Sequence, residues 1–166
     1  MNLHRAFAHL PSFVLHFEAM TAELKATMDT RRYELVTLAA ALALRSSYCA
    51  LAHASVLLRD GMEADELARI AGDRQQAHLS DVERQLMAYA EDIVWDAAAV
   101  DGDRVNDLRQ LGLSDKEISE AAAAAALRCY FSKYLDAVGT EADADFAAMS
   151  PLLRHLLVRG RAISDT

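Results

Sequence analysis

Apolar residues recur at three- and four-residue spacing through most of this chain, which is the spacing of one face of an α-helix. After Pro11 the pattern consists of Phe13, Val14, Phe17, Met20 and Leu24. The full sequence holds only six Gly and two Pro, which leaves little room for the many tight turns of a β-rich fold. We therefore predict an all-α fold.

Capping signals divide the chain into separate helices. The pattern Ser-x-x-Glu begins at Ser80 and at Ser114, and each occurrence is a capping box that opens a helix, the first expected to reach Trp95 and the second about Gly139. Further helices are predicted from caps at Thr30, at Ser46 or Ser47 and at Ser150, with a short one from Met62 to Ile70. Because no linker or repeat interrupts the chain, we expect one domain over residues 1–166 with a single sizeable core.

Composition limits the classes of partner. The net charge of −8 repels a phosphate backbone, which argues against nucleic-acid binding. No apolar run is as long as a membrane span, and the N-terminus lacks the apolar core of a signal peptide. Two cysteines in a chain of this size do not suggest a secreted disulfide scaffold. We expect a cytoplasmic protein that binds neither nucleic acid nor membrane.

One short stretch carries the chemistry. Cys49 and His53 are four residues apart in a helix-forming segment, so both side chains project from one face, where the imidazole can take the thiol proton. Glu34, in the preceding apolar helix, is a carboxylate that can orient this histidine. If Ser46 or Ser47 caps the helix, Cys49 lies in its first turn, where the dipole favours a thiolate. The alternative is that Cys49 and His53 are ordinary core residues.

The same residues resemble the alkylhydroperoxidase D-like / carboxymuconolactone decarboxylase superfamily. Its peroxidase branch carries a Glu on one helix and Cys-x-x-Cys-x-x-x-His at the start of the next. Glu34, Cys49 and His53 match the glutamate, the second cysteine and the histidine, whereas Ser46 stands where the first cysteine would be. The segment 111–118 and the Ala-rich helix after it also resemble the peroxidase-related subgroup, so that the resemblance covers roughly residues 10 to 150.

The resemblance implies an alkylhydroperoxidase D-like helical bundle that assembles as a trimer or hexamer. It also implies a thiol peroxidase in which Cys49 attacks a hydroperoxide or other small-molecule substrate while His53 and Glu34 relay protons. In that family the first cysteine resolves the oxidised second one, which Ser46 cannot do, so an external thiol is expected as the reductant. Cys129, in apolar surroundings, is expected to be a core residue.

Two other functions stay open. In a non-redox reaction like that of carboxymuconolactone decarboxylase, His53 and Glu34 would be acid–base groups and Cys49 incidental. The chain could also be a non-enzymatic helical oligomer that has lost the resolving cysteine. No cofactor or metal is expected, because the sequence has no Gly-rich phosphate loop and its histidines show no ligand spacing. Among the other residues, Arg31 and Arg32 are expected to pair with local acids, and Trp95, Tyr130 and Phe131 to lie in the core.

Overall fold

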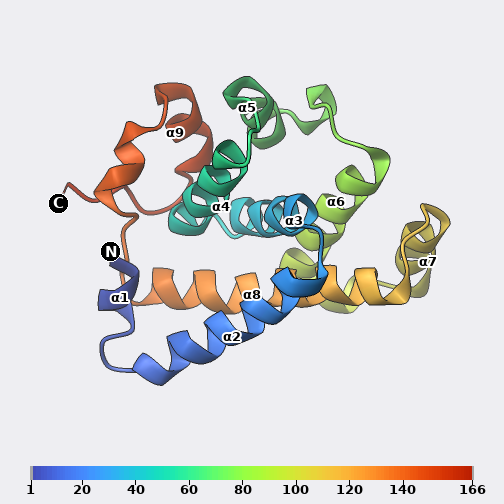
Figure 1. Cartoon of the computed structure of the whole chain (residues 1–166), viewed down its shortest axis with the longest axis horizontal. Coiled ribbons are helices and arrows are strands. Elements are labelled where there is room, and N and C mark those ends of the chain that lie inside the picture. The colour runs from blue at the N-terminus through green and yellow to red at the C-terminus, as the bar shows by residue number, and fades with distance from the viewer. Residues whose placement is uncertain (1, 166) are drawn as a thin grey trace.

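The computed structural model describes residues 2–165 and confirms an all-α fold (Figure 1). Its helices are α1 (Asn2–Ala6), α2 (Pro11–Thr27), α3 (Thr30–Ala43), α4 (Ser47–Arg59), α5 (Ala64–Gly72), α6 (Asp81–Asp96), α7 (Gly102–Gln110), α8 (Asp115–Ala137) and α9 (Pro151–Leu157). Short 3-10 turns and one isolated bridge between Ala142 and Ile163 complete the described part of the chain. None of the helices within residues 2–165 has the length and apolar character needed to cross a membrane.

Helix α3 is the centre of the molecule. It packs against α4, α6 and α8, and Figure 1 shows it between the long α8 and the upper helices. Every residue from Tyr33 to Leu42 is buried, and the small side chains of Ala39, Ala40 and Ala41 let the neighbouring helices approach closely. Two of these buried residues, Glu34 and Thr37, are polar. Because buried polar groups must be partnered, their contacts build the site described below.

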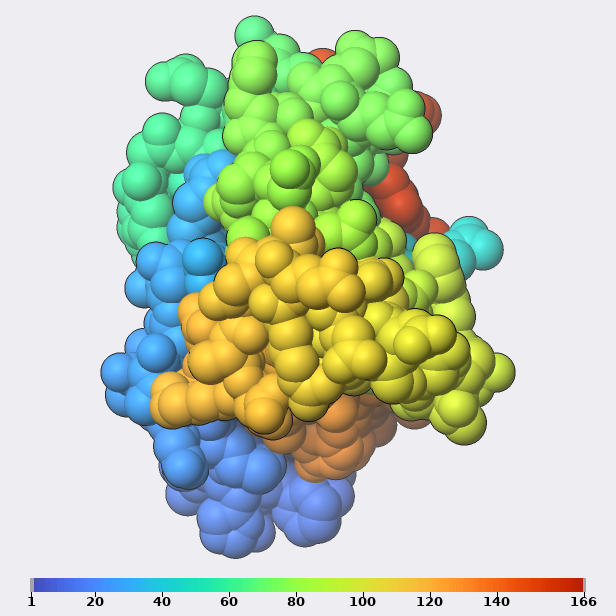
Figure 2. Space-filling view, turned by 90° about the vertical axis from the view of Figure 1, so that its right-hand side faces the viewer, coloured from blue at the N-terminus to red at the C-terminus, as the bar shows by residue number. Residues whose placement is uncertain are grey.

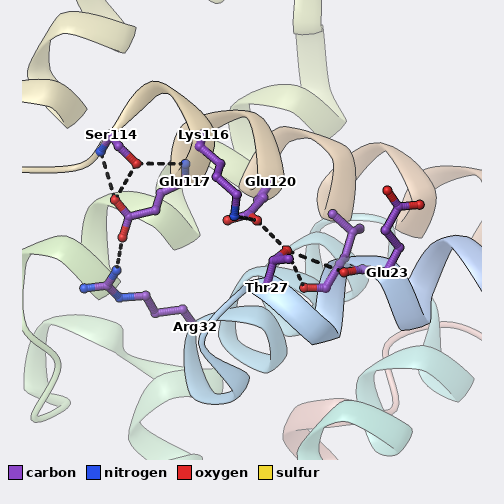
Figure 3. A network of polar contacts seen from close by, with 8 residues as sticks. Glu23, Thr27, Arg32, Ser114, Lys116, Glu117 and Glu120 are labelled. Atoms are coloured by element: carbon purple, nitrogen blue, oxygen red, sulfur yellow. Dashed lines mark hydrogen bonds and ion pairs between the residues drawn. The ribbon is translucent and has the colours of Figure 1, made fainter.

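A polar network holds the end of α2 against the starts of α3 and α8 (Figure 3). Ser114 and Glu117 form the capping box of α8, and Arg32 Nη1 donates to Glu117 Oε1 at 2.9 Å. One turn further along α8, Glu120 pairs with Lys116 and accepts a 2.5 Å hydrogen bond from the Thr27 hydroxyl. These contacts fix the position of α2, whose inner face reaches the site.

Helix α7 covers the ends of α6 and α8 on the side away from α4 and α9. Figure 2 shows it on the near surface together with the first turns of α8, with α5 and α6 above and α2 below. Its Arg104 bridges to α6 through Asp92 at 2.9 Å and Gln85 at 2.7 Å, and Leu108 is its one fully buried side chain. Because α7 buries so few apolar side chains, its sequence shows no clear helical spacing of apolar residues, and it was not predicted from the sequence. Helix α1 was not predicted either.

Several predicted boundaries are confirmed and others are wrong. Capping boxes open α6 and α8, and Ser150 caps α9. The cap of α3 is Asp29 rather than Thr30, since the Asp29 carboxylate accepts from Arg32 N at 2.9 Å. Arg31 and Arg32 pair with Glu83 and Glu117 as expected. Phe131 is buried as predicted, whereas Trp95 is 68 % exposed and Tyr130 38 % exposed, so neither is a core residue.

Candidate active site at Cys49, His53 and Glu34

A tight turn after α3 places the start of α4. Arg45 has φ of +58°, the left-handed conformation usually left to glycine. Its N–H bonds the carbonyl of Leu42 and that of Ser46 bonds Ala41, which is the hydrogen-bond pattern of a Schellman motif. The Arg45 carbonyl lies so close to Gly160 that a Cβ there would stand 2.2 Å from it. Gly160 is therefore required where the C-terminal segment crosses this turn.

The predicted serine cap of α4 is wrong in its chemistry. Ser46 holds the cap position but its side chain makes no cap hydrogen bond, and the Ser47 hydroxyl instead accepts from Gly160 N at 2.9 Å. Ser47 therefore anchors the C-terminal segment rather than the helix. Cys49 still lies in the first turn of α4, next to the unpaired amide groups of a helix N-terminus.

Glu34 and His53 form the predicted contact between α3 and α4. His53 Nδ1 lies 2.5 Å from Glu34 Oε2 and 3.0 Å from the Thr37 hydroxyl. That hydroxyl donates to the carbonyl of Tyr33 at 2.8 Å, so its oxygen is free to accept. Because both neighbours of Nδ1 are acceptors, we infer that Nδ1 carries the proton and that Nε2 holds the lone pair. Nε2 is the nitrogen that can act as a base.

The surrounding charges keep Glu34 ionised and His53 neutral. Burial alone would raise the pKa of Glu34, but the hydrogen bonds and charges of His53 and Lys25 together lower it below its usual range. Lys25 of α2 reaches Glu34 Oε1 at 2.9 Å. Burial, followed by the charge of Arg128, lowers the pKa of His53 to about 4, against the opposing effect of Glu34. At neutral pH the pair is therefore a carboxylate bonded to a neutral imidazole.

The thiol of Cys49 contacts a residue that is distant in the sequence. Arg128 of α8 donates from Nη1 to Cys49 Sγ at 3.3 Å. Cys49 is 1 % exposed, and Arg128 is also buried. The sulfur is therefore in contact with a fixed positive charge, which the spacing of Cys49 and His53 could not reveal.

These groups line one cavity of about 350 Å3 between α2, α4 and α8. Cys49, His53, Glu34 and Arg128 all belong to its wall, and the apolar part of the wall is formed by Val14, Phe17, Val56, Phe131 and Phe146. A small molecule with an apolar portion can therefore be held beside the thiol.

Tyr48 closes the edge of this cavity. Its hydroxyl donates to Asp143 Oδ2 at 2.7 Å, and Asp143 also accepts from Asn2 N, so the start of α1 is held at the same carboxylate. Burial and this hydrogen bond raise the pKa of Tyr48, which keeps it a donor. Tyr48 is therefore part of the cavity wall.

Other candidate residues lie away from the site. Cys129 is only partly buried and lies outside the core cluster, so its predicted core position is wrong. It follows Arg128 in α8, where successive side chains point about 100° apart, and it does not line the cavity. His4, His9 and His16 are exposed, and within residues 2–165 no three His, Cys, Asp or Glu side chains converge as metal ligands.

Sequence reasoning therefore found three of the polar groups at the site and missed three. The missed residues are Arg128, Lys25 and Thr37, which contact Cys49, Glu34 and His53 respectively. For Arg128 a signal was present, because an arginine on the otherwise Ala-rich face of a long helix needs a specific partner when it is buried.

Comparison with known proteins agrees with this fold. The sequence model of the carboxymuconolactone decarboxylase family matches residues 9–92. An uncharacterized peroxidase-related protein from Ralstonia eutropha, described as an alkylhydroperoxidase AhpD core, superposes with a TM-score of 0.80 at 20 % identity, over 89 % of this chain and 80 % of that one. A peroxidase-related protein from Silicibacter sp. gives 0.79 at 16 % identity, over 87 % and 77 %.

A third structure, a protein of unknown function from Agrobacterium tumefaciens, gives a TM-score of 0.71 at 17 % identity, over 87 % of this chain and 94 % of that one. At these identities the three structures establish the shared fold. No curated protein matches the sequence.

Proposed function

The chain belongs to the carboxymuconolactone decarboxylase family, and we propose that it is a thiol-dependent peroxidase that reduces small hydroperoxides. The observation that carries this proposal is the meeting of a thiol, a histidine with a free Nε2 and an ionised carboxylate at one small cavity. A thiol catalyst needs all three functions: a nucleophile, a base close to it, and a group that orients the base.

The proposed reaction begins with loss of the thiol proton. His53 Nε2 accepts the proton of Cys49, and Glu34 stabilises the imidazolium through Nδ1–H. The thiolate attacks the terminal oxygen of the hydroperoxide, an S–O bond forms and the O–O bond breaks. The departing alkoxide takes the proton from His53 and leaves as an alcohol. Cys49 is oxidised to a sulfenic acid and the peroxide is reduced.

An external thiol completes the cycle. Its sulfur displaces water from the sulfenic acid to form a mixed disulfide, and a second thiol releases Cys49 together with an external disulfide. The chain supplies no evident thiol of its own for this step, because Ser46 occupies the position of the first cysteine and Cys129 does not line the cavity.

Limiting hydroperoxide should oxidise Cys49 before Cys129. Cys49 has a base nearby and opens to the cavity, whereas burial raises the pKa of the Cys129 thiol. Trapping of sulfenic acid followed by peptide mass spectrometry measures which cysteine reacts, and peroxide consumption with and without added thiol measures turnover. The Cys129→Ser variant should turn over as wild type does. Preferential oxidation of Cys129 would overturn the assignment of the nucleophile.

Replacing Ser46 with cysteine should allow a disulfide to Cys49 and raise turnover with a dithiol reductant. Residues three apart at the start of a helix are close enough for this bond, and no cap is lost because the Ser46 side chain does not cap α4. Oxidation should remove the mass of two hydrogens. Ser47→Cys is the matched control, since a thiol two residues from Cys49 points to another face. A Ser46→Cys protein that forms sulfenic acid but no disulfide would contradict the expectation.

A second candidate is a non-redox acid–base reaction of the same family. The observation that favours it is the pair of cations at the cavity, Lys25 and Arg128, which suit a carboxylate substrate. In that case His53 would transfer protons to and from the substrate, and Cys49 would stay unoxidised by limiting peroxide.

The homo-oligomer expected from the resemblance also stays a prediction. Its support is the set of exposed apolar side chains on α2, namely Phe13, Leu15 and Met20.

A further inference from the structure

Arg128 is a buried cation whose one hydrogen bond among the described residues goes to the sulfur of Cys49. It is 5 % exposed, and its Nη1 donates to Cys49 Sγ at 3.3 Å. The guanidinium also lies against two aromatic rings, 5.6 Å from the centre of Phe17 and 5.4 Å from that of Phe131. The rings favour a cation sterically and electrostatically, but they do not neutralise its charge.

No carboxylate of the described part of the chain balances this charge at contact distance. Within residues 2–165, none of the ion pairs involves Arg128, and its Nε has no hydrogen-bond partner. A guanidinium does not lose its proton under ordinary conditions, and a buried charge without a counter-ion is costly. A negative charge on Cys49 Sγ would supply that counter-ion.

We propose that Arg128 is a further catalytic residue, which stabilises the negative charge on the Cys49 sulfur while His53 and Glu34 transfer the proton. This inference rests on the peroxidase proposed above. The division of roles follows from the charges, since His53 is held neutral and cannot itself be a resting counter-ion. Arg128 also disfavours an imidazolium at His53, so a proton taken up there is readily passed on to the departing alkoxide.

Charge-selective alkylation of Cys49 tests the proposal without any hydroperoxide. Iodoacetamide is neutral and iodoacetate is an anion, so the ratio of their rates reports the positive charge at the sulfur. Other titratable groups around the cavity are Glu18 and Lys25 of α2, Tyr33 and Glu34 of α3, Tyr48 and His53 of α4, and Asp143. They are unchanged in Arg128 variants, so a change in the ratio is attributable to Arg128.

In Arg128→Met, alkylation of Cys49 by iodoacetamide at neutral pH should slow by about 10–100-fold, the range of a charged hydrogen bond. The difference from wild type should shrink at alkaline pH, where the thiol ionises without help, and the rate of iodoacetate relative to iodoacetamide should fall. Arg128→Lys should restore part of both effects. Lys133→Met, which removes an exposed charge five residues further along α8, is the matched control and should leave Cys49 unaffected.

An unchanged pH profile and rate ratio in folded Arg128→Met would overturn the proposal. If circular dichroism shows that Arg128→Met does not fold, the wild type and Arg128→Lys decide the question. The proposal would then be overturned if, in both proteins, the rate of iodoacetate relative to iodoacetamide were the same at Cys49 as at Cys129. Failure of the proposed peroxidase function can be told apart from failure of this proposal. A wild type that shows charge-dependent alkylation but no peroxide turnover would contradict the peroxidase, and Arg128 would still be the counter-ion of Cys49.

Discussion

Replacing His53 with glutamine should slow the oxidation of Cys49 by hydroperoxide by about 10²–10⁴-fold, the usual contribution of a general base. Glutamine roughly preserves the volume and can still bond Glu34, but it cannot accept the thiol proton. The reason lies in the tautomer: Glu34 and Thr37 both accept at Nδ1, which leaves Nε2 as the nitrogen that can accept a proton. Stopped-flow oxidation at limiting hydroperoxide, with circular dichroism as a check on folding, measures the effect.

Two further variants sharpen this test. Glu34→Gln removes the charge that stabilises the imidazolium and should also slow oxidation. His78→Gln is the matched control, because that histidine is exposed and its side chain pairs with Glu66, away from the cavity. Wild-type oxidation rates in both the His53 and the Glu34 variants, with intact folding, would mean that the resemblance to peroxidases extends to the fold alone.

The wild-type protein should lose about 3 kcal/mol of stability from His53 as the pH falls from about 6.5 to about 4. The pKa of His53 is about 4 in the folded protein, against an ordinary value of 6.5. Between pH 6.5 and 4 the unfolded chain binds a proton at His53 that the folded protein does not bind. The contribution of His53 to the free energy of unfolding is therefore fully present above pH 6.5 and is lost on acidification. Each pKa unit between the two states corresponds to 1.36 kcal/mol, which sets the magnitude.

Urea unfolding at a series of pH values measures this loss. The lowered pKa of Glu34 acts in the same direction, since its contribution is present above its ordinary value of 4.5 and is lost below it. In His53→Gln the part of the slope between pH 6.5 and 4.5 should flatten. The same slope in wild type and His53→Gln would show that His53 is not held neutral by the fold.

Much of the secondary structure could be predicted because its causes are local. A capping box needs only residues three apart, so Ser80 and Ser114 identify the starts of α6 and α8 without knowledge of the fold. A glycine in the left-handed conformation, Gly139, follows the end of α8 at Ala137 for the same local reason. The prediction failed at the turn before α4, where Arg45 adopts that conformation and Ser47 bonds a backbone amide 113 residues away.

The residues of the candidate site also fall into those that local sequence predicts and those that only tertiary packing brings in. Cys49 and His53 share a face because four residues make one helical turn, and Glu34 could be matched by its register in a known family. The sequence by itself therefore determined the all-α fold and these three polar groups. Only the packing of α2, α3, α4 and α8 decided that Lys25, Thr37 and Arg128 join them, because those contacts depend on how helices lie in space. Packing also decided that His53 is neutral, because its pKa is set by burial and by a charge 75 positions away along the chain.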